Sequence, residues 1–98
     1  MTPIRWTPQA ADDLAAIHDY IARDSAFYAR SVAERILTAI DRLEDFPLSG
    51  RVVPELQRED IREIIQRPYR IVYRVKEDSV HILTIFRSSM LLPALPDI

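Results

Sequence analysis

Three arginines are the residues of this sequence whose types and spacing could support chemistry. Arg70 and Arg74 share one face of a predicted strand, because side chains two residues apart point the same way. Arg87 ends the next predicted strand. If both basic strand ends lie on the open face of a sheet, the three guanidinium groups form a shallow patch that suits phosphate or carboxylate. The alternative is a solvated sheet face with cross-strand ion pairs to Glu63 or Glu77.

The rest of the sequence offers no familiar set of catalytic or metal-binding residues. There is no cysteine, which excludes a thiol nucleophile and thiolate metal ligands. His18 and His81 have no partner at metal-ligand spacing, so we expect both to be structural or surface residues. Gly50 is the only glycine, which excludes a glycine-rich phosphate loop. We therefore expect no metal and no cofactor, and a protein that works by binding rather than as an enzyme.

The composition is that of a single domain covering residues 1–98. Hydrophobic residues make up 48% of the chain and charged residues 29%, a balance that argues against intrinsic disorder. With a net charge of −2, any anionic target must be met by a local cluster of cations. No apolar stretch approaches the ~20 residues that span a membrane, and the first residues lack a signal-peptide pattern. We expect a cytoplasmic protein that binds neither membranes nor specific nucleic-acid sequences.

Hydrophobic periodicity divides the chain into a helical first half and a strand-rich second half. After a short strand at residues 4–6, Thr7 and Pro8 suit the N-cap and the first position of a helix. Apolar residues three and four apart predict one helix from residue 8 to about residue 23 and a second that ends before Pro47. The period then changes to that of strands with short gaps. These predicted strands are 51–53, 61–65, 69–75 and 80–86.

These elements predict an α+β fold. The two amphipathic helices form an antiparallel hairpin that packs on one face of a small antiparallel β-sheet, with a short N-terminal strand and a partly open second face. The tail after residue 90 is apolar and holds two prolines, so it cannot form a long helix. Its leucines either fold back along the sheet, which is the favoured arrangement, or contact a partner. These leucines are Leu91, Leu92 and Leu95.

Three segments form a specific pattern through their order and spacing. The first runs from Trp6-Thr7 to Tyr20-Ile21, the second reads FPLSGRVVPE at 46–55, and the third joins REII at 62–65 to PYRIVYRV at 68–75. These segments resemble the ParE/RelE toxins of type II toxin–antitoxin systems, and the resemblance extends over nearly the whole chain. The order of strand, two helices and sheet, which periodicity indicates independently, agrees with this resemblance.

The resemblance implies a toxin that causes growth arrest, is associated with plasmid stabilisation and is silenced by a cognate antitoxin. In such families the C-terminal segment of the antitoxin wraps over the helices and sheet of the toxin, and its N-terminal part is often a ribbon-helix-helix DNA binder. A ParD-like antitoxin is therefore the expected partner. The apolar tail would suit an amphipathic helix of this partner, which makes Leu91, Leu92 and Leu95 the expected contacts.

Within this superfamily the sequence is more similar to the ParE branch, which inhibits DNA gyrase, than to the RelE branch, which cuts mRNA on the ribosome. RelE-type toxins use lysines, arginines and a C-terminal tyrosine or similar group to balance charge and activate the 2′-hydroxyl. Arg70 matches the sheet arginine of the family, but Lys76 is the only lysine and no tyrosine follows Tyr73. Many relatives end the last strand with a His-x-Arg-Arg-like motif; here residues 87–90 read RSSM, similar to some ParE members.

The sequence therefore leaves three functions to weigh. The first is a gyrase inhibitor with no catalytic residues of its own. The second is an mRNA endoribonuclease that uses Arg70, Arg74 and Arg87. The third is a non-toxic relic that still binds an antitoxin. We place the first ahead of the second, with the third close behind.

Overall fold

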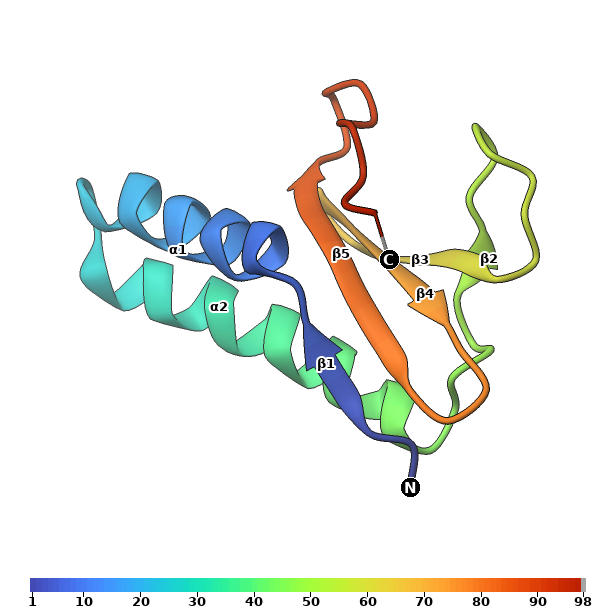
Figure 1. Ribbon diagram of the computed structural model, residues 1–98. Coiled ribbons are helices and arrows are strands. Elements are labelled where there is room, and N and C mark those ends of the chain that lie inside the picture. The colour runs from blue at the N-terminus through green and yellow to red at the C-terminus, as the bar shows by residue number, and fades with distance from the viewer. Residues whose placement is uncertain (98) are drawn as a thin grey trace.

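The computed structural model describes residues 1–97 and shows a helical layer against a five-stranded sheet (Figure 1). The two helices form a hairpin over one face of the sheet, and the end of the hairpin where α1 passes into α2 projects away from the sheet. The predicted α+β fold is confirmed. The elements in chain order are β1 (Ile4–Trp6), α1 (Pro8–Ala22), α2 (Ala26–Asp41), the 3₁₀ helix η1 (Arg42–Glu44), β2 (Arg51–Val52), β3 (Ile61–Gln66), β4 (Tyr69–Val75) and β5 (Val80–Arg87).

Side-chain caps determine where both helices begin. The Thr7 hydroxyl accepts a hydrogen bond from the backbone N–H of Ala10 at 3.1 Å, which satisfies one of the free donors at the start of α1. The same hydroxyl donates to the carbonyl oxygen of Ile82 at 2.8 Å, so the cap also ties α1 to β5. The Ser25 hydroxyl accepts from the N–H of Tyr28 at 3.0 Å and caps α2 in the same way.

The sheet has the strand order β1-β5-β4-β3-β2. Strands β2 to β5 form the predicted antiparallel meander, but β1 pairs in parallel with β5, with Ile4 beside Val80. The sheet is therefore mixed rather than wholly antiparallel. Two helices and the strands β2 to β4 lie between β1 and β5 in the chain. Because this connection is long and not a tight turn, the two strands can pair in parallel.

An extra residue in β5 breaks the alternation that the sequence predicted for this strand. Tyr73 pairs with Ile82 while the preceding residue of β4 pairs with Thr84, so Leu83 is bulged out of the register. Consequently Ile82 and Ile85 both face the helices, and Leu83 faces the other side. Strict alternation would place His81, Leu83, Ile85 and Arg87 on one face of the sheet, and the bulge breaks this arrangement.

Asp13 of α1 holds the irregular backbone beyond this bulge. One of its carboxylate oxygens accepts hydrogen bonds from the Thr84 hydroxyl at 2.6 Å and from the N–H of Ile85 at 3.0 Å. Its carboxylate thus supplies a partner for a backbone donor beside the bulge.

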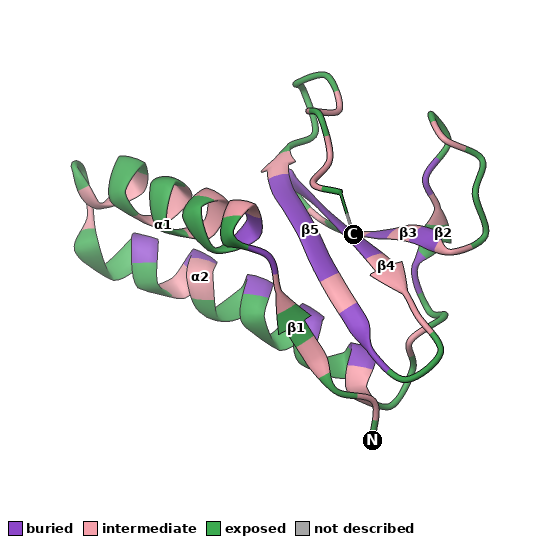
Figure 2. Ribbon diagram, in the orientation of Figure 1, coloured by how far each residue is buried: buried purple, intermediate pink, exposed green. Residues whose placement is uncertain are grey.

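Apolar residues pack on both faces of the sheet (Figure 2). The first core lies between the helices and the sheet and includes the fully buried Ile36, Tyr73 and Ile82. The second core lies on the opposite face. Each large side chain buried in this way contributes about 1.5–3 kcal/mol. The second core consists of Val53, Ile61, Val72 and Leu83, with Leu56, Phe86, Leu92 and Leu95 packed against it.

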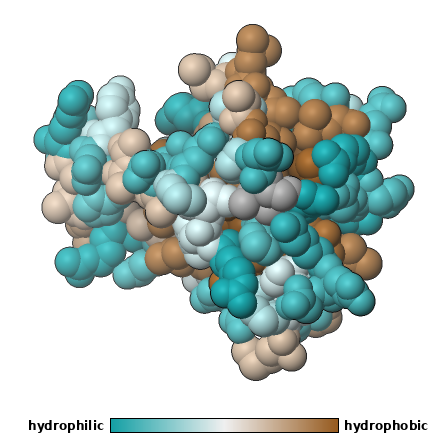
Figure 3. Space-filling model, in the orientation of Figure 1, coloured by the Kyte–Doolittle hydropathy of each residue, from teal (hydrophilic) through white to brown (hydrophobic). Residues whose placement is uncertain are grey.

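The C-terminal tail folds back over this second core, as the sequence favoured. Leu92 and Leu95 are half-buried there, and the Gln9 side-chain amide donates to the carbonyl oxygen of Ala94 at 3.3 Å. Leu91 points to solvent and is 92% exposed. Figure 3 shows apolar surface at the top of the view, over the segment that follows β5. Within residues 1–97, no helix is long and apolar enough to cross a membrane.

Candidate functional site

The turn before β2 brings its backbone against a buried tyrosine. The Gly50 N–H donates to the Tyr73 hydroxyl at 2.9 Å, and this hydroxyl donates to the carbonyl oxygen of Pro47 at 2.9 Å. A Cβ atom at Gly50 would lie 2.5 Å from the Tyr73 oxygen and 2.6 Å from the carbonyl oxygen of Glu63. Position 50 therefore requires glycine, because these two oxygen atoms leave no room for a side chain. Burial raises the pKa of Tyr73, which keeps its hydroxyl protonated as a donor.

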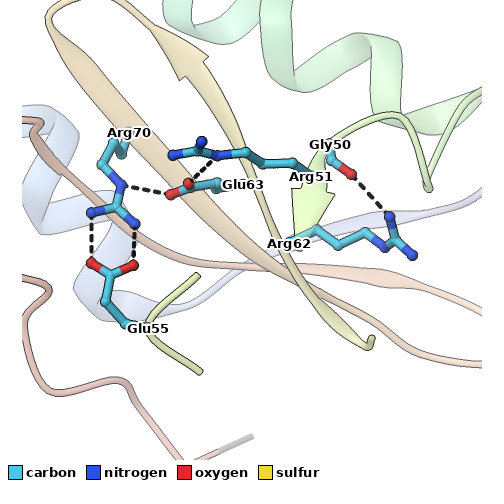
Figure 4. A network of polar contacts seen from close by, with 6 residues as sticks. All are labelled: Gly50, Arg51, Glu55, Arg62, Glu63 and Arg70. Carbon is cyan, nitrogen blue, oxygen red and sulfur yellow. Dashed lines mark hydrogen bonds and ion pairs between the residues drawn. The ribbon is translucent and has the colours of Figure 1, made fainter. Parts of the chain in front are cut away.

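A fully buried carboxylate, Glu63 of β3, lies between two arginines from neighbouring strands (Figure 4). It accepts from Nε of Arg51 on β2 and from Nε of Arg70 on β4, each at 2.6 Å. The strand register produces this arrangement, because Arg51 pairs directly with Glu63 and Arg70 pairs with Ile65, two residues further along β3. The cations compensate for the loss of solvent around the carboxylate.

Arg70 is held by a second carboxylate as well. Its two terminal nitrogens donate to the two oxygens of Glu55, each at 2.8 Å, and its guanidinium lies 5.0 Å from the centre of the Phe86 ring. Hydrogen bonds from Arg70 lower the pKa of Glu55 from 4.5 to about 2, and the same contact raises the pKa of Arg70. Arg70 therefore has the cross-strand ion pair to Glu63 that the sequence offered as the alternative to an open cationic patch.

The three arginines singled out from the sequence do not lie together as one patch. Arg74 donates to Asp60 at 2.9 Å near the opposite end of β4. Arg87 is exposed, and its guanidinium lies 5.7 Å from the centre of the Tyr69 ring, with which it is paired across the strands. Arg70 and Arg87 line the same hollow at the end of the sheet, and Arg74 is not part of its lining.

This arginine hollow is lined by Arg51, Arg67, Arg70, Arg87, Ser88 and Ser89 together with two apolar residues of β3 and its turn, and it has a volume of about 580 Å³. No lining residue is a histidine, lysine, tyrosine or acid. Arg51 and Arg67 were not among the site residues predicted from the sequence, because only the pairing of β2 with β3 and the position of the β3–β4 turn bring them here. The sequence did contain one signal for Arg51: Glu63 is an acid inside a predicted strand, and the neighbouring predicted strands carry Arg51 and Arg70.

A second, apolar hollow is lined by residues of both helices and by Trp6 of β1. Trp6, Leu14 and Leu37 contribute to its lining, and its volume is about 440 Å³. His18 also lines this hollow, and its ring contacts the Asp19 carboxylate at 3.2 Å. The second histidine, His81 of β5, lies elsewhere, and burial lowers its pKa. Across residues 1–97, no group of three histidines or acids is arranged to hold a metal ion.

The fold is that of the toxins of type II toxin–antitoxin systems in the ParE/RelE superfamily. Residues 4–92 match the model of the ParE toxin family, described as the ParE toxin of the type II toxin–antitoxin system parDE. The chain therefore belongs to the ParE toxin family, and the resemblance read from the sequence is confirmed.

Individual relatives carry names from both branches of the superfamily. Toxin RelE2 of Caulobacter vibrioides is 37% identical over 91 residues, which cover 93% of this chain and all of the relative. Among solved structures, the chromosomal ParDE system from P. aeruginosa has a TM-score of 0.73 and 29% identity, covering 89% of this chain and 96% of that one. The RelBE2 toxin–antitoxin complex of Mycobacterium tuberculosis agrees in fold, with a TM-score of 0.51, 22% identity and coverage of 88% and 90%.

Proposed function

We propose that this toxin acts in the cytoplasm as a ParE-like inhibitor of DNA gyrase, and that it acts by binding rather than by cutting a substrate. The family match, to the toxin of parDE, and the similarity to a chromosomal ParDE system support the ParE branch. Both comparisons cover most of the chain, so the likeness is not confined to one motif.

The observation that carries this proposal is the chemistry of the arginine hollow. An RNA-cleaving site needs a base for the 2′-hydroxyl and free positive charge for the developing phosphorane. The titratable groups of the hollow lining are all guanidinium groups, which do not lose a proton in proteins. An endonuclease would need Arg70 to contact its substrate, but all three nitrogens of this guanidinium already donate hydrogen bonds to Glu63 and Glu55. The hollow thus favours binding over general acid–base catalysis.

The partner that we propose for the toxin is a ParD-like antitoxin of the ribbon-helix-helix type. The ParDE and RelBE2 neighbours are toxin–antitoxin systems, which supports such a partner for this chain. The apolar hollow on the helix hairpin and the exposed Leu91 offer surface for an amphipathic helix. Leu92 and Leu95 already pack against the second core, so an antitoxin would reach them only at their exposed edges or by displacing the tail.

A ribosome-dependent mRNA endonuclease is the second candidate. The relative named Toxin RelE2 covers nearly the whole chain and favours it, as does the exposed guanidinium of Arg87 beside Tyr69. The two candidates differ in the first process that stops in the cell, DNA synthesis or protein synthesis. An inactive relic stops neither.

The first test is to induce the chain without its antitoxin and to pulse-label DNA and protein synthesis in the same culture. We expect DNA synthesis to stop first while protein synthesis continues, and the purified toxin to inhibit plasmid supercoiling by gyrase. Early loss of protein synthesis with cleaved messages would replace the proposal with the endonuclease. Unchanged synthesis of both would favour the relic, for which retained binding to the neighbouring antitoxin is the check.

A further inference from the structure

We infer that the arginine hollow binds the phosphodiester backbone of a nucleic acid through Arg67 and Arg87. Neither side chain forms an ion pair with any residue of the range 1–97. Both are exposed and line the hollow. The contact is to backbone phosphates and reads no base sequence, so it needs no groove-reading element.

The charges around the hollow do not cancel. Glu63 and Glu55 balance Arg51 and Arg70, with donor–acceptor distances of 2.6 to 2.8 Å. The guanidinium groups of Arg67 and Arg87 remain, and no carboxylate is part of the lining. A surplus of two positive charges in one hollow, on a chain with a net charge of −2, is a local feature rather than a general property of the surface.

The backbone holds the two sides of the hollow at a fixed separation. Arg67 lies in the turn between β3 and β4, and Arg87 is the last residue of β5. The N–H of Ser88 donates to the carbonyl oxygen of Pro68 at 2.8 Å, which joins the turn to the end of β5. The two cations are therefore placed by the sheet, so little ordering of the backbone is needed when an anion binds.

Phosphate fits this lining better than the side chains of an acidic peptide. Arg70, the buried guanidinium of the hollow, already pairs with two carboxylates of the chain, those of Glu55 and Glu63. The remaining donors are the exposed guanidinium groups of Arg67 and Arg87, the terminal nitrogens of Arg51, and the hydroxyls of Ser88 and Ser89. A phosphodiester chain carries one charge at every nucleotide and two free oxygens that accept from both kinds of donor. The volume of about 580 Å³ is in the range that admits a group of nucleotide size.

This inference deepens the proposed function, because gyrase holds DNA and a bound toxin would meet its backbone. The test uses the purified full chain alone, so its outcome is separate from gyrase inhibition. Fluorescence anisotropy at ~50 mM salt would follow binding of a labelled 12-nucleotide single-stranded DNA, the same sequence as RNA, and a 12-base-pair duplex. A labelled oligoglutamate of similar charge, measured in the same way, tests the alternative that the hollow binds an acidic peptide.

The variants are Arg67→Ala and Arg87→Ala, with Arg30→Ala as the matched control. Arg30 is an exposed arginine of α2 that is not part of the hollow, so its removal changes the net charge equally. Each hollow variant should weaken binding about tenfold and make the slope of log K against log salt shallower by ~0.7 to 0.9, the value for one phosphate contact. Thermal unfolding of each variant should match that of the wild type, because both side chains are exposed.

The preferred oligonucleotide identifies the source of the phosphates. Tighter binding of DNA fits action on gyrase, and tighter binding of RNA assigns the hollow to a ribosomal or messenger strand. Either result supports the phosphodiester site, provided that Arg30→Ala leaves binding unchanged. Binding of oligoglutamate in place of the oligonucleotides, no binding of either, or equal losses in all three variants would overturn it.

Discussion

Replacing Arg70 by alanine tests whether this arginine is a structural residue or a functional one. Arg70→Ala removes one of the two partners of the Glu63 carboxylate, whose side chain is 0% exposed, and both hydrogen bonds to Glu55. Loss of one partner of a buried ion pair costs about 3–5 kcal/mol. Glu63 keeps the hydrogen bond from Arg51 at 2.6 Å, so we expect the lower part of this range, about 3–4 kcal/mol.

Urea unfolding followed by the fluorescence of Trp6 measures this loss. Trp6 is the only tryptophan, and it packs against the first core. With a slope of about 1–2 kcal/mol/M for a small domain, the midpoint should fall by roughly 1.5–4 M while the slope stays unchanged. Arg87→Ala is the control from the same hollow and should change stability by no more than about 0.5 kcal/mol, since its side chain is exposed.

A double variant separates the ion pair from simple loss of packing. Arg70→Met with Glu63→Gln removes both charges, so it should be more stable than Arg70→Ala alone, because no buried carboxylate is left short of a partner. A loss below about 1 kcal/mol in Arg70→Ala would refute the reasoning. Arg70 would then be free to act on a substrate, and loss of toxicity in this variant could be attributed to function. If the loss of stability is as large as expected, a loss of toxicity in Arg70→Ala would reflect unfolding of the toxin and would not show that Arg70 acts on a substrate.

Three further predictions concern contacts that hold the same scaffold. Asp13→Ala should lower the free energy of unfolding by about 1–3 kcal/mol in thermal or urea melts, because it leaves the N–H of Ile85 without its partner, whereas Asp12→Ala at an exposed position should have little effect. Gly50→Ala should cost about 1–3 kcal/mol, since its Cβ would lie 2.5 Å from the Tyr73 oxygen; an unchanged melting temperature would contradict this. The pKa of Glu55 is lowered in the folded state, so its contribution is present above pH 4.5 and declines as the pH falls toward 2; melting curves of wild type and Glu55→Gln should differ at pH 6 and converge near pH 2.

The sequence by itself determined the class of fold and, within a few residues, the limits of the two α-helices and the strands. Thr7 with Pro8 predicts the start of α1, and this position is confirmed because a cap depends only on neighbouring residues. The strands from β2 to β5 were predicted within one or two residues, since alternation and turn residues are also local signals. The order and spacing of three segments identified the superfamily, which the family match confirms.

Only the tertiary structure decided which charged residues meet. The bulge at Leu83 shifts Arg87 to the side of Tyr69, and no local pattern reveals an extra residue that a neighbouring strand fails to pair. The register of β2 and β3 places Arg51 against Glu63, and a loop brings Glu55 onto Arg70. Strand alternation predicts which residues share a face, but the partner across the sheet depends on register and on loop paths, which arise from packing of the whole chain.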